Sequence, residues 1–415
     1  MHIMSKMKVI ALFASLLIVS SLACCKNTKK DYNVLFQAEE LISQKKYLSA
    51  YQLLDKYDPK NEKSAIFLKK VVIVQNYFLF NIMNQIFCLD DIPFDKDVED
   101  LRGNEEASGC SSVLFAIDTI AERLLEKEPD NTLLYKCLGD YYVSAARRFG
   151  DNWLDQTTES ELMARARPYF LKAEQLGCND DEMLGDIAES YLYETNYADA
   201  RTYFAKAIAR SHDTIANYHY NMAVAHYSDH ENGDLAKAKQ HASIAVRHYP
   251  QGSDYQYDAL YILGMSHLRG NEYEQAIQCF ERADKIDAGR YYLLINMLGA
   301  QLKSNSPKFE ATTERMINLF SESTYVMSAL PDIYMSNDRT KCGTLETLLK
   351  RQIAKNAGQM STACCEMSLG ALLLDTERKA EARQHLLKAK EIFSEQSEAD
   401  EEIISYINEM LKHAK

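Results

Sequence analysis

Residues 260–267 read Leu-Tyr-Ile-Leu-Gly-Met-Ser-His, and residues 270–283 read Gly-Asn-Glu-Tyr-Glu-Gln-Ala-Ile-Gln-Cys-Phe-Glu-Arg-Ala. Phe280 and Ala283 follow Ala276 by four and seven residues, so these three side chains share one face of a helix. Gly264 and Ala276 are small enough to let two helices approach closely where they cross. The two segments therefore predict a pair of helices joined by a short turn.

The same spacing of large and small residues recurs in other parts of the chain. Copies occupy residues 184–207, 220–250 and 369–389, and weaker copies cover 34–58 and 293–320, while 325–357 are degenerate. One further copy opens at Tyr135–Tyr142, but an insertion that holds the single tryptophan, Trp153, delays its second helix until Ala166–Ala173. Self-similarity of this kind predicts a stack of helical pairs that bury a continuous core between neighbours.

The repeated unit resembles the tetratricopeptide repeat, a helix–turn–helix unit of about 34 residues. The resemblance is clearest over residues 180–290 and extends over most of the chain after the N-terminal segment. It implies an all-α fold, namely an α-solenoid of tetratricopeptide-type helix–turn–helix repeats that forms a right-handed superhelix.

The composition agrees with long helices. The chain has 415 residues, of which 47% are hydrophobic, but only 15 are glycine and 7 are proline. Sheets need many turns rich in these two residues, and no Asn-Gly or Asp-Gly pair stands between alternating runs, so we expect no sheet. The net charge of −13 repels phosphate backbones, so we expect no nucleic-acid partner.

Residues 64–128 are interpreted as one expanded helical pair that an acidic loop splits. Its apolar stretch from Val71 to Leu89 places Ile73, Phe80 and Phe87 seven residues apart, which suits a helix packed within the stack. Five amide side chains in this stretch would be costly in a bilayer, so a membrane-spanning helix is the weaker alternative.

The N-terminus has the layout of a secretory signal, because Lys6 and Lys8 precede an apolar run that ends near Leu22. The sequence then reads Ala23-Cys24-Cys25, which resembles a bacterial lipobox whose cysteine is acylated after cleavage. We assign the lipid to Cys24, with Cys25 as the alternative. An ordinary cleaved signal followed by two incidental cysteines is the other interpretation. The resemblance implies a lipid-anchored protein of the bacterial cell envelope, at the outer membrane and facing the periplasm.

Together, the repeats and the signal divide the chain into five regions. They are a lipoprotein signal peptide (1–23), an acylated cysteine with its tether (24–33), degenerate N-terminal helical repeats (34–128), the tetratricopeptide repeat array (129–395) and a C-terminal capping helix (396–415). A capping helix is expected because the outer face of a terminal repeat must be polar.

The cysteines give no metal or redox signature, since no Cys-x-x-Cys occurs. Cys137 and Cys279 fall at positions where a small apolar side chain would serve. We interpret the isolated cysteines, Cys88 and Cys110 included, as buried thiols. A disulfide is the alternative in an exported protein.

Two histidines, His226 and His230, lie four residues apart on one helix face and form a possible metal site. We prefer a packing role, because His226 occupies the aromatic core position of its repeat. The chain has no Gly-rich phosphate loop, His-Glu-x-x-His or Gly-x-Ser-x-Gly motif. We therefore predict no catalytic activity, cofactor or metal, and a metal-dependent enzyme remains the least favoured alternative.

In a tetratricopeptide fold, the first helix of each repeat lines a concave groove, and this assigns the candidate partner-binding residues. They are Lys136, Asp140, Asp186, Glu189, Tyr193, Tyr220, Asn221, Tyr227, Tyr261, Met265, Arg269, Asn296 and Lys303. Asn221 matches the asparagine that clamps a peptide carboxylate in chaperone-binding relatives, although acidic residues stand where those relatives have lysine or arginine. A tyrosine-lined strip with acidic neighbours predicts an extended or helical peptide with basic and apolar side chains.

These observations predict a non-catalytic interaction scaffold that binds another protein or a peptide in its groove. The alternative is a glycan-capturing outer-membrane lipoprotein of the starch-utilisation type, which presents aromatic platforms to sugars. Trp153, in its insertion, is the candidate platform for that alternative.

Overall fold

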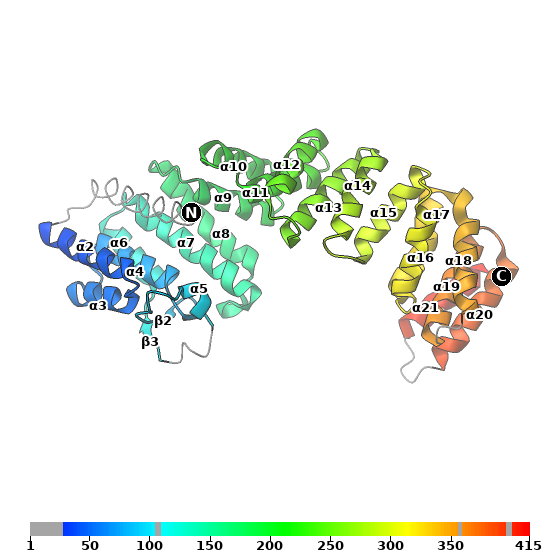
Figure 1. Ribbon diagram of the computed structural model, residues 1–415, viewed down its shortest axis with the longest axis horizontal. Coiled ribbons are helices and arrows are strands. Elements are labelled where there is room, and N and C mark those ends of the chain that lie inside the picture. The colour runs from blue at the N-terminus through cyan, green and yellow to red at the C-terminus, as the bar shows by residue number, and fades with distance from the viewer. Residues whose placement is uncertain (1–27, 104–108, 356–358, 396–400) are drawn as a thin grey trace. The chain divides into compact units, whose positions relative to one another are not determined.

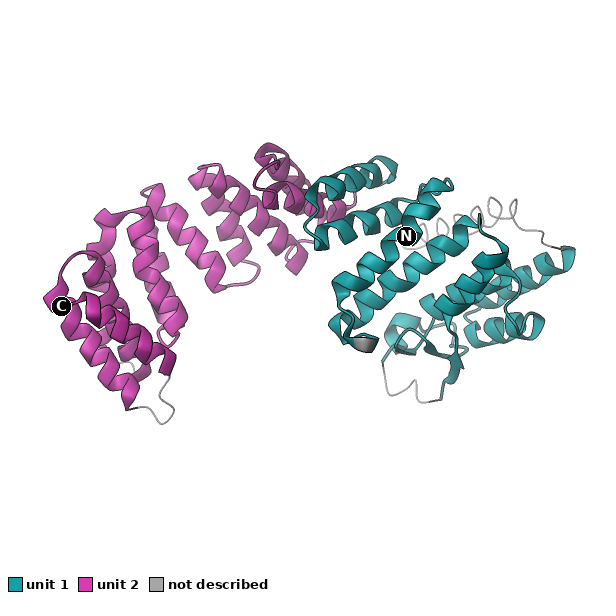
Figure 2. Ribbon diagram, turned by 180° about the vertical axis from the view of Figure 1, so that it is seen from behind, with its two compact units in different colours: residues 1–213 teal, residues 214–415 magenta. Residues whose placement is uncertain are grey.

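The computed structural model describes residues 28–103, 109–355, 359–395 and 401–415. The chain forms two compact units, unit 1 up to Asp213 and unit 2 from Thr214 onward (Figure 2). Cys24 and Cys25, the candidate lipid acceptors, lie outside the described residues.

Unit 1 consists of antiparallel helices with a small sheet inserted among them (Figure 1). Its helices are α2 (Lys29–Ser43), α3 (Tyr47–Tyr57), α4 (Ser64–Asn76), α5 (Val98–Leu101), α6 (Ile117–Lys127), α7 (Thr132–Phe149), α8 (Glu159–Gln175), α9 (Asp181–Tyr193) and α10 (Tyr197–Arg210). The tight pairs are α2 with α3, α7 with α8, and α9 with α10, as expected for helix–turn–helix units.

Unit 2 repeats the helical pair along its whole length and shares one continuous apolar core. Its helices are α11 (Ala216–Ser228), α12 (Leu235–His248), α13 (Asp254–Arg269), α14 (Tyr273–Asp284), α15 (Tyr291–Lys303), α16 (Phe309–Phe320), α17 (Thr324–Asn337), α18 (Cys342–Ala354), α19 (Gln359–Asp375), α20 (Lys379–Ser394) and α21 (Glu401–His413). The prediction of an all-α solenoid built from helix–turn–helix units is confirmed as the fold class.

Small residues lie where the paired helices cross, as the sequence pattern predicts. A Cβ atom added to Gly264 would lie 2.5 Å from the Phe280 ring, and one added to Gly139 would lie 2.2 Å from Phe170. Ala276 is fully buried at the same kind of crossing. The glycines are therefore required by close packing of the two helices and not by turn geometry.

The turn between the two helices of a pair has the same hydrogen-bonding pattern in five places. Each turn contains one residue in the left-handed backbone region: Lys45, Thr195, Asn271, Asn305 and Glu377. In each turn the next residue donates its backbone N–H to the carbonyl five residues earlier, as Glu272 does to His267 at 2.9 Å. This is the hydrogen bond of a Schellman C-cap, which satisfies carbonyls that the helix end would leave unpaired.

The prediction of no sheet, with a helix through residues 71–89, is wrong. Helix α4 ends at Asn76, and an antiparallel sheet of order β1-β2-β3 follows, formed by β1 (Phe80–Ile82), β2 (Ile86–Leu89) and β3 (Ser111–Leu114). The Asn81 side chain accepts the Asn84 N–H at 2.9 Å, and Asn84 has a positive φ of 53°. The amides in this apolar stretch therefore build a hairpin turn.

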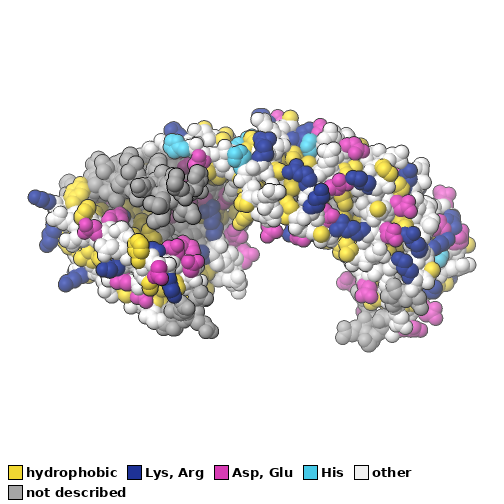
Figure 3. Space-filling model, viewed as in Figure 1, with side chains coloured by type: hydrophobic (Ala, Val, Ile, Leu, Met, Phe, Trp, Pro, Cys, Tyr) yellow, Lys and Arg dark blue, Asp and Glu magenta, His cyan; other side chains and the backbone are white. Residues whose placement is uncertain are grey.

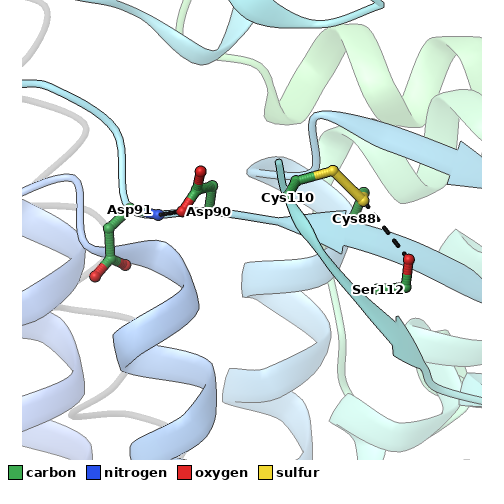
Figure 4. Close-up of a disulfide and its surroundings, with 5 residues drawn as sticks. All are labelled: Cys88, Asp90, Asp91, Cys110 and Ser112. Atoms are coloured by element: carbon green, nitrogen blue, oxygen red, sulfur yellow. Dashed lines mark hydrogen bonds between the residues drawn. A yellow bond between two sulfur atoms is a disulfide. The ribbon is translucent and has the colours of Figure 1, made fainter. Parts of the chain in front are cut away.

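A disulfide joins Cys88 on β2 to Cys110 just before β3, with the Cα atoms 5.5 Å apart (Figure 4). The interpretation of these two cysteines as free thiols is wrong, and the alternative of a disulfide applies to them. The free cysteines within the described ranges are buried, except Cys178, which is partly exposed. The disulfide could not be predicted from the sequence because the two cysteines are 22 residues apart and belong to no recognisable motif.

Asp91, which follows β2, attaches the sheet to the helices. Its Oδ1 accepts the backbone N–H of Ser49 in the first turn of α3 at 2.9 Å, so it caps a helix that has no side-chain cap of its own.

No helix among the described residues combines the length and the apolar character that crossing a membrane requires.

Candidate functional site

Four of the predicted groove residues form a row of two linked pairs across the first helices α11, α13 and α15 of unit 2. Arg269 at the end of α13 donates from Nη1 to the carbonyl oxygen of Tyr227 on α11 at 2.6 Å. Its guanidinium also lies 5.6 Å from the centroid of the Tyr227 ring. Arg269 therefore joins two successive first helices by a hydrogen bond and a cation–π contact.

Asn296 on α15 continues the row. Its Nδ2 donates to the hydroxyl oxygen of Tyr261 on α13 at 3.1 Å and to the backbone carbonyl of Tyr292 at 2.7 Å. The rings of Tyr261 and Tyr292 meet edge to face, with centroids 5.3 Å apart. Burial and neighbouring tyrosines raise the pKa of Tyr261 to about 12, so its phenol is neutral at physiological pH. We call Tyr227, Arg269, Tyr261 and Asn296 the tyrosine row.

The other predicted groove residues of unit 2 lie in different surroundings. Asn221 is buried, and Tyr220 is half-buried with its ring 6.4 Å from that of Tyr249. Met265 packs against the core, and exposed Lys303 lies 5.9 Å from the Tyr273 ring centroid. Two observations therefore disfavour a carboxylate clamp at Asn221. Its side chain is buried, and acidic residues stand where the chaperone-binding relatives have lysine or arginine.

The predicted residues of unit 1 are paired with one another or with neighbours. Lys136 forms an ion pair with Asp140 at 3.0 Å on α7. Tyr193 donates its hydroxyl to the carboxylate of Glu159 at 2.6 Å. These contacts place the side chains within salt-bridged and hydrogen-bonded pairs, so they offer few unused polar groups to a partner.

Arg147, which the sequence analysis missed, compensates the two acidic residues of α9 that were predicted for the groove, Asp186 and Glu189. Its Nη2 lies 2.6 Å from Asp186 and 2.9 Å from Glu189. Burial raises the pKa of the Asp186 carboxyl, and the adjacent guanidinium opposes that shift. Arg147 follows Lys136 and Asp140 at helical spacing, so the periodicity of α7 could have identified it.

Three exposed tyrosines near the starts of first helices were also missed. Tyr255, Tyr291 and Tyr325 stand in the first turns of α13, α15 and α17, and the rings of Tyr291 and Tyr325 meet edge to face at 5.7 Å. Their recurrence at the same place in successive pairs was visible in the sequence. On the face that Figure 3 shows, acidic and basic side chains are interspersed over unit 2.

The histidines near α11 pack against one another. The Nδ1 atoms of His219 and His241 lie 2.8 Å apart, and the rings of His226 and His241 are stacked with centroids 6.3 Å apart. Burial, with the neighbouring imidazoles of His241 and His248, lowers the pKa of His219 to about 4. Across the described residues, no three His, Cys, Asp or Glu side chains are grouped as metal ligands.

Trp153, the candidate platform for a sugar, is buried. Its ring contacts the rings of Phe149 and Tyr141, with centroids 5.3 and 6.4 Å away. A buried indole has no free face on which a sugar could stack, so the structure does not favour the glycan-binding alternative at this residue.

The comparisons with known proteins identify the repeat over part of the chain. Residues 231–291 match the family model described as tetratricopeptide repeat. No curated protein matches the chain.

Several solved structures are similar at low sequence identity. YrrB, described as a TPR protein with an unusual peptide-binding site, is 15% identical over 50% of this chain and 96% of its own, with a TM-score of 0.40. The C-terminal part of a TPR repeat-containing protein from Cytophaga hutchinsonii is 12% identical over 65% and 92%, with a TM-score of 0.40. A tetratricopeptide repeat protein from Parabacteroides merdae is 16% identical over 71% and 98%, with a TM-score of 0.37.

Residues 231–291 thus match the tetratricopeptide repeat model. The same region of the structure has the helix pairs, the small residues at the crossings and the repeated turn. The protein is an all-α solenoid of helix–turn–helix repeats, and its residues 231–291 are similar to the tetratricopeptide repeat.

Proposed function

We propose that this protein is a non-catalytic interaction scaffold that binds a peptide or protein segment along the tyrosine row of unit 2. The observation that carries the proposal is that three successive first helices are joined by two linked pairs, Arg269 with Tyr227 and Asn296 with Tyr261. The scaffold is held by a lipid on Cys24 to the outer membrane of a bacterial envelope and faces the periplasm.

The chemistry of the row suits a peptide. All four side chains are partly exposed, so their outer faces remain available for contact. Tyrosine rings give large apolar contact area at little cost in side-chain entropy, and Asn296 and Arg269 add hydrogen-bond donors that a peptide carbonyl can accept. The partner is therefore a segment with apolar side chains spaced to meet the rings.

Support for a location outside the cytoplasm comes from the disulfide between Cys88 and Cys110. Disulfides persist in oxidising compartments such as the bacterial periplasm and are rare where thiol reductants are abundant. The lipobox-like sequence at Cys24 adds the anchor. Labelling with a radioactive fatty acid tests it, and we expect Cys24→Ser to abolish both the label and membrane attachment. Label that persists in the double variant Cys24→Ser/Cys25→Ser would rule out the lipoprotein assignment.

Site-specific photocrosslinking tests the binding surface. A benzophenone amino acid in place of Tyr261 should crosslink a discrete partner in intact membranes. The same amino acid in place of Gln278, which is exposed on the second helix α14, is the matched control. Tyr261→Phe, which keeps the ring and loses only the hydroxyl, should retain binding better than Tyr261→Ala. Equal crosslinking from both positions would refute a partner that binds the first-helix face.

A further inference from the structure

Two arginines in unit 1 stack on the same aromatic ring. The guanidinium carbon of Arg102, just after α5, lies 4.1 Å from the centroid of the Phe78 ring, and that of Arg148 on α7 lies 4.5 Å from it. Phe78 itself is buried, while both arginines are exposed residues. The same ring therefore contacts two positively charged groups at the surface, although like charges repel.

Among the described residues, the hydrogen bonds of these two guanidinium groups go to neutral oxygens. Arg102 donates to the carbonyls of Phe78 and Asn76 at 3.1 and 2.9 Å. Arg148 donates to the Asn84 side chain and the Gln75 carbonyl at 3.1 and 2.9 Å. Within the part of the chain that the structure describes, neither arginine forms an ion pair with a carboxylate.

The helix ends at this place compensate only part of the charge. Two of the bonds cap the final carbonyls of α4, and Arg148 also stands in the last turn of α7. Each helix C-terminus contributes about half a negative charge, so the part of the chain that the structure describes leaves roughly one of the two positive charges uncompensated. Partial burial and the Arg102 charge lower the pKa of Arg148 to about 10, which still leaves it protonated at neutral pH.

Each guanidinium also has donors to spare. A guanidinium carries five N–H groups in a planar fork, and the contacts above use two on each arginine. Planar forks match the oxygens of phosphate and carboxylate groups, and a second nearby positive charge favours a group that carries two negative charges. Capping of α4 alone would need neither the second charge nor the unused donors.

We infer that Arg102 and Arg148 form a binding site for a doubly charged tetrahedral oxyanion, a phosphate group presented free or on a larger ligand. The site stands on unit 1 and does not depend on the tyrosine row. One arginine contacts the anion oxygens directly, and the other lies close enough for its charge to strengthen the attraction.

Calorimetric titration and thermal unfolding of the full chain test the site, with phosphate exchanged for chloride at constant ionic strength. Inorganic phosphate should bind and raise the melting temperature, and Arg102→Gln/Arg148→Gln should weaken binding at least about tenfold. The double lysine variant keeps both charges but loses the forks, so it should bind with intermediate affinity. Vesicles that contain phosphatidic acid are compared with phosphatidylcholine vesicles, which the proposed anchor alone would bind. More sedimentation with phosphatidic acid indicates a lipid-borne phosphate, and equal sedimentation indicates free phosphate.

Arg123 provides the matched control. It is an exposed arginine that also donates to backbone carbonyls, those of Lys60 and Asn61, but the described residues place no second guanidinium beside it. Arg123→Gln should leave phosphate binding unchanged. Each single glutamine variant is tested as well, so that a double variant that fails to fold, as judged by circular dichroism, does not decide the outcome.

Two results would overturn the inference. The first is an equal phosphate response in the native chain and in the single glutamine variants, which would assign the arginines a structural role only. The second is acetate binding as tight as phosphate binding, which would indicate a carboxylate site.

Discussion

Two glycines at the same repeat position should respond oppositely to alanine. Gly264 and Gly299 each follow the leucine of a Leu-Gly pair on a first helix. A Cβ at Gly264 would lie 2.5, 2.8 and 3.1 Å from three carbons of the Phe280 ring, whereas one at Gly299 would meet Asn337 at an ordinary 3.5 Å. Gly264→Ala should therefore destabilise unit 2, and Gly299→Ala should stabilise it.

The magnitudes follow from two opposing terms. Alanine in a helix interior is more favourable than glycine by about 1 kcal/mol. Overpacking a filled core costs about 1–3 kcal/mol, and the fully buried Phe280 ring has little room to move. We expect Gly264→Ala to lower the free energy of unfolding by up to about 2 kcal/mol, and Gly299→Ala to raise it by about 0.5–1 kcal/mol.

Urea unfolding followed by far-ultraviolet circular dichroism measures both changes. A double variant isolates the contact, because Phe280→Leu should reduce the cost of Gly264→Ala if the ring is the atom group that clashes. The reasoning is refuted if Gly264→Ala stabilises the protein as much as Gly299→Ala does. It is also refuted if the effects of Gly264→Ala and Phe280→Leu are simply additive.

Three further predictions concern the turns, the histidines and the disulfide. Thr195→Gly should raise the free energy of unfolding by about 1 kcal/mol, because a β-branched residue there has a φ of 59°; an unchanged urea midpoint would contradict this. His219 is buried, and folding lowers its pKa from 6.5 to about 4, so the unfolded chain binds a proton more readily than the folded chain. The free energy of unfolding is therefore unaffected by this group above pH 6.5 and should fall by up to about 3 kcal/mol toward pH 4. Urea midpoints at pH 7 and pH 4.5 measure that loss, and His219→Gln should reduce it. A non-reducing digest should yield a peptide pair linked through Cys88 and Cys110, and replacing both cysteines by serine should cost up to about 3 kcal/mol in unit 1; alkylation of Cys88 in the unreduced protein would argue against the bond.

The repeat was predictable because its causes are local. Gly264, Ala276 and Phe280 lie within one helical pair, and their spacing alone determines which faces meet and how closely. The turn residues are local too, since each Schellman bond spans five residues along the chain. Features whose cause lies within one pair can be inferred from a single sequence.

The sheet and the disulfide were not predictable for the opposite reason. The apolar run after Asn76 fits a packed helix by its seven-residue spacing and a strand by its alternation, so periodicity does not decide between them. The run forms strands because β2 pairs with β3, which follows it only after the segment that the Cys88–Cys110 bond closes. The sequence of neither segment alone shows that the two pair.

The net charge of the candidate groove differs from the charge of the residues that the sequence assigned to it. Asp186 and Glu189 made the first helices of unit 1 look acidic, but Arg147 lies between them and offsets their charge. The expectation of a basic partner depended on those carboxylates being uncompensated, so it loses its support. In our proposals, attraction by charge belongs to the Arg102–Arg148 pair and is directed at an anion, while the tyrosine row binds through apolar contact and hydrogen bonds. Raised salt should therefore weaken phosphate binding to unit 1 and leave partner binding to the tyrosine row largely intact, because screening acts on charges and not on apolar contacts.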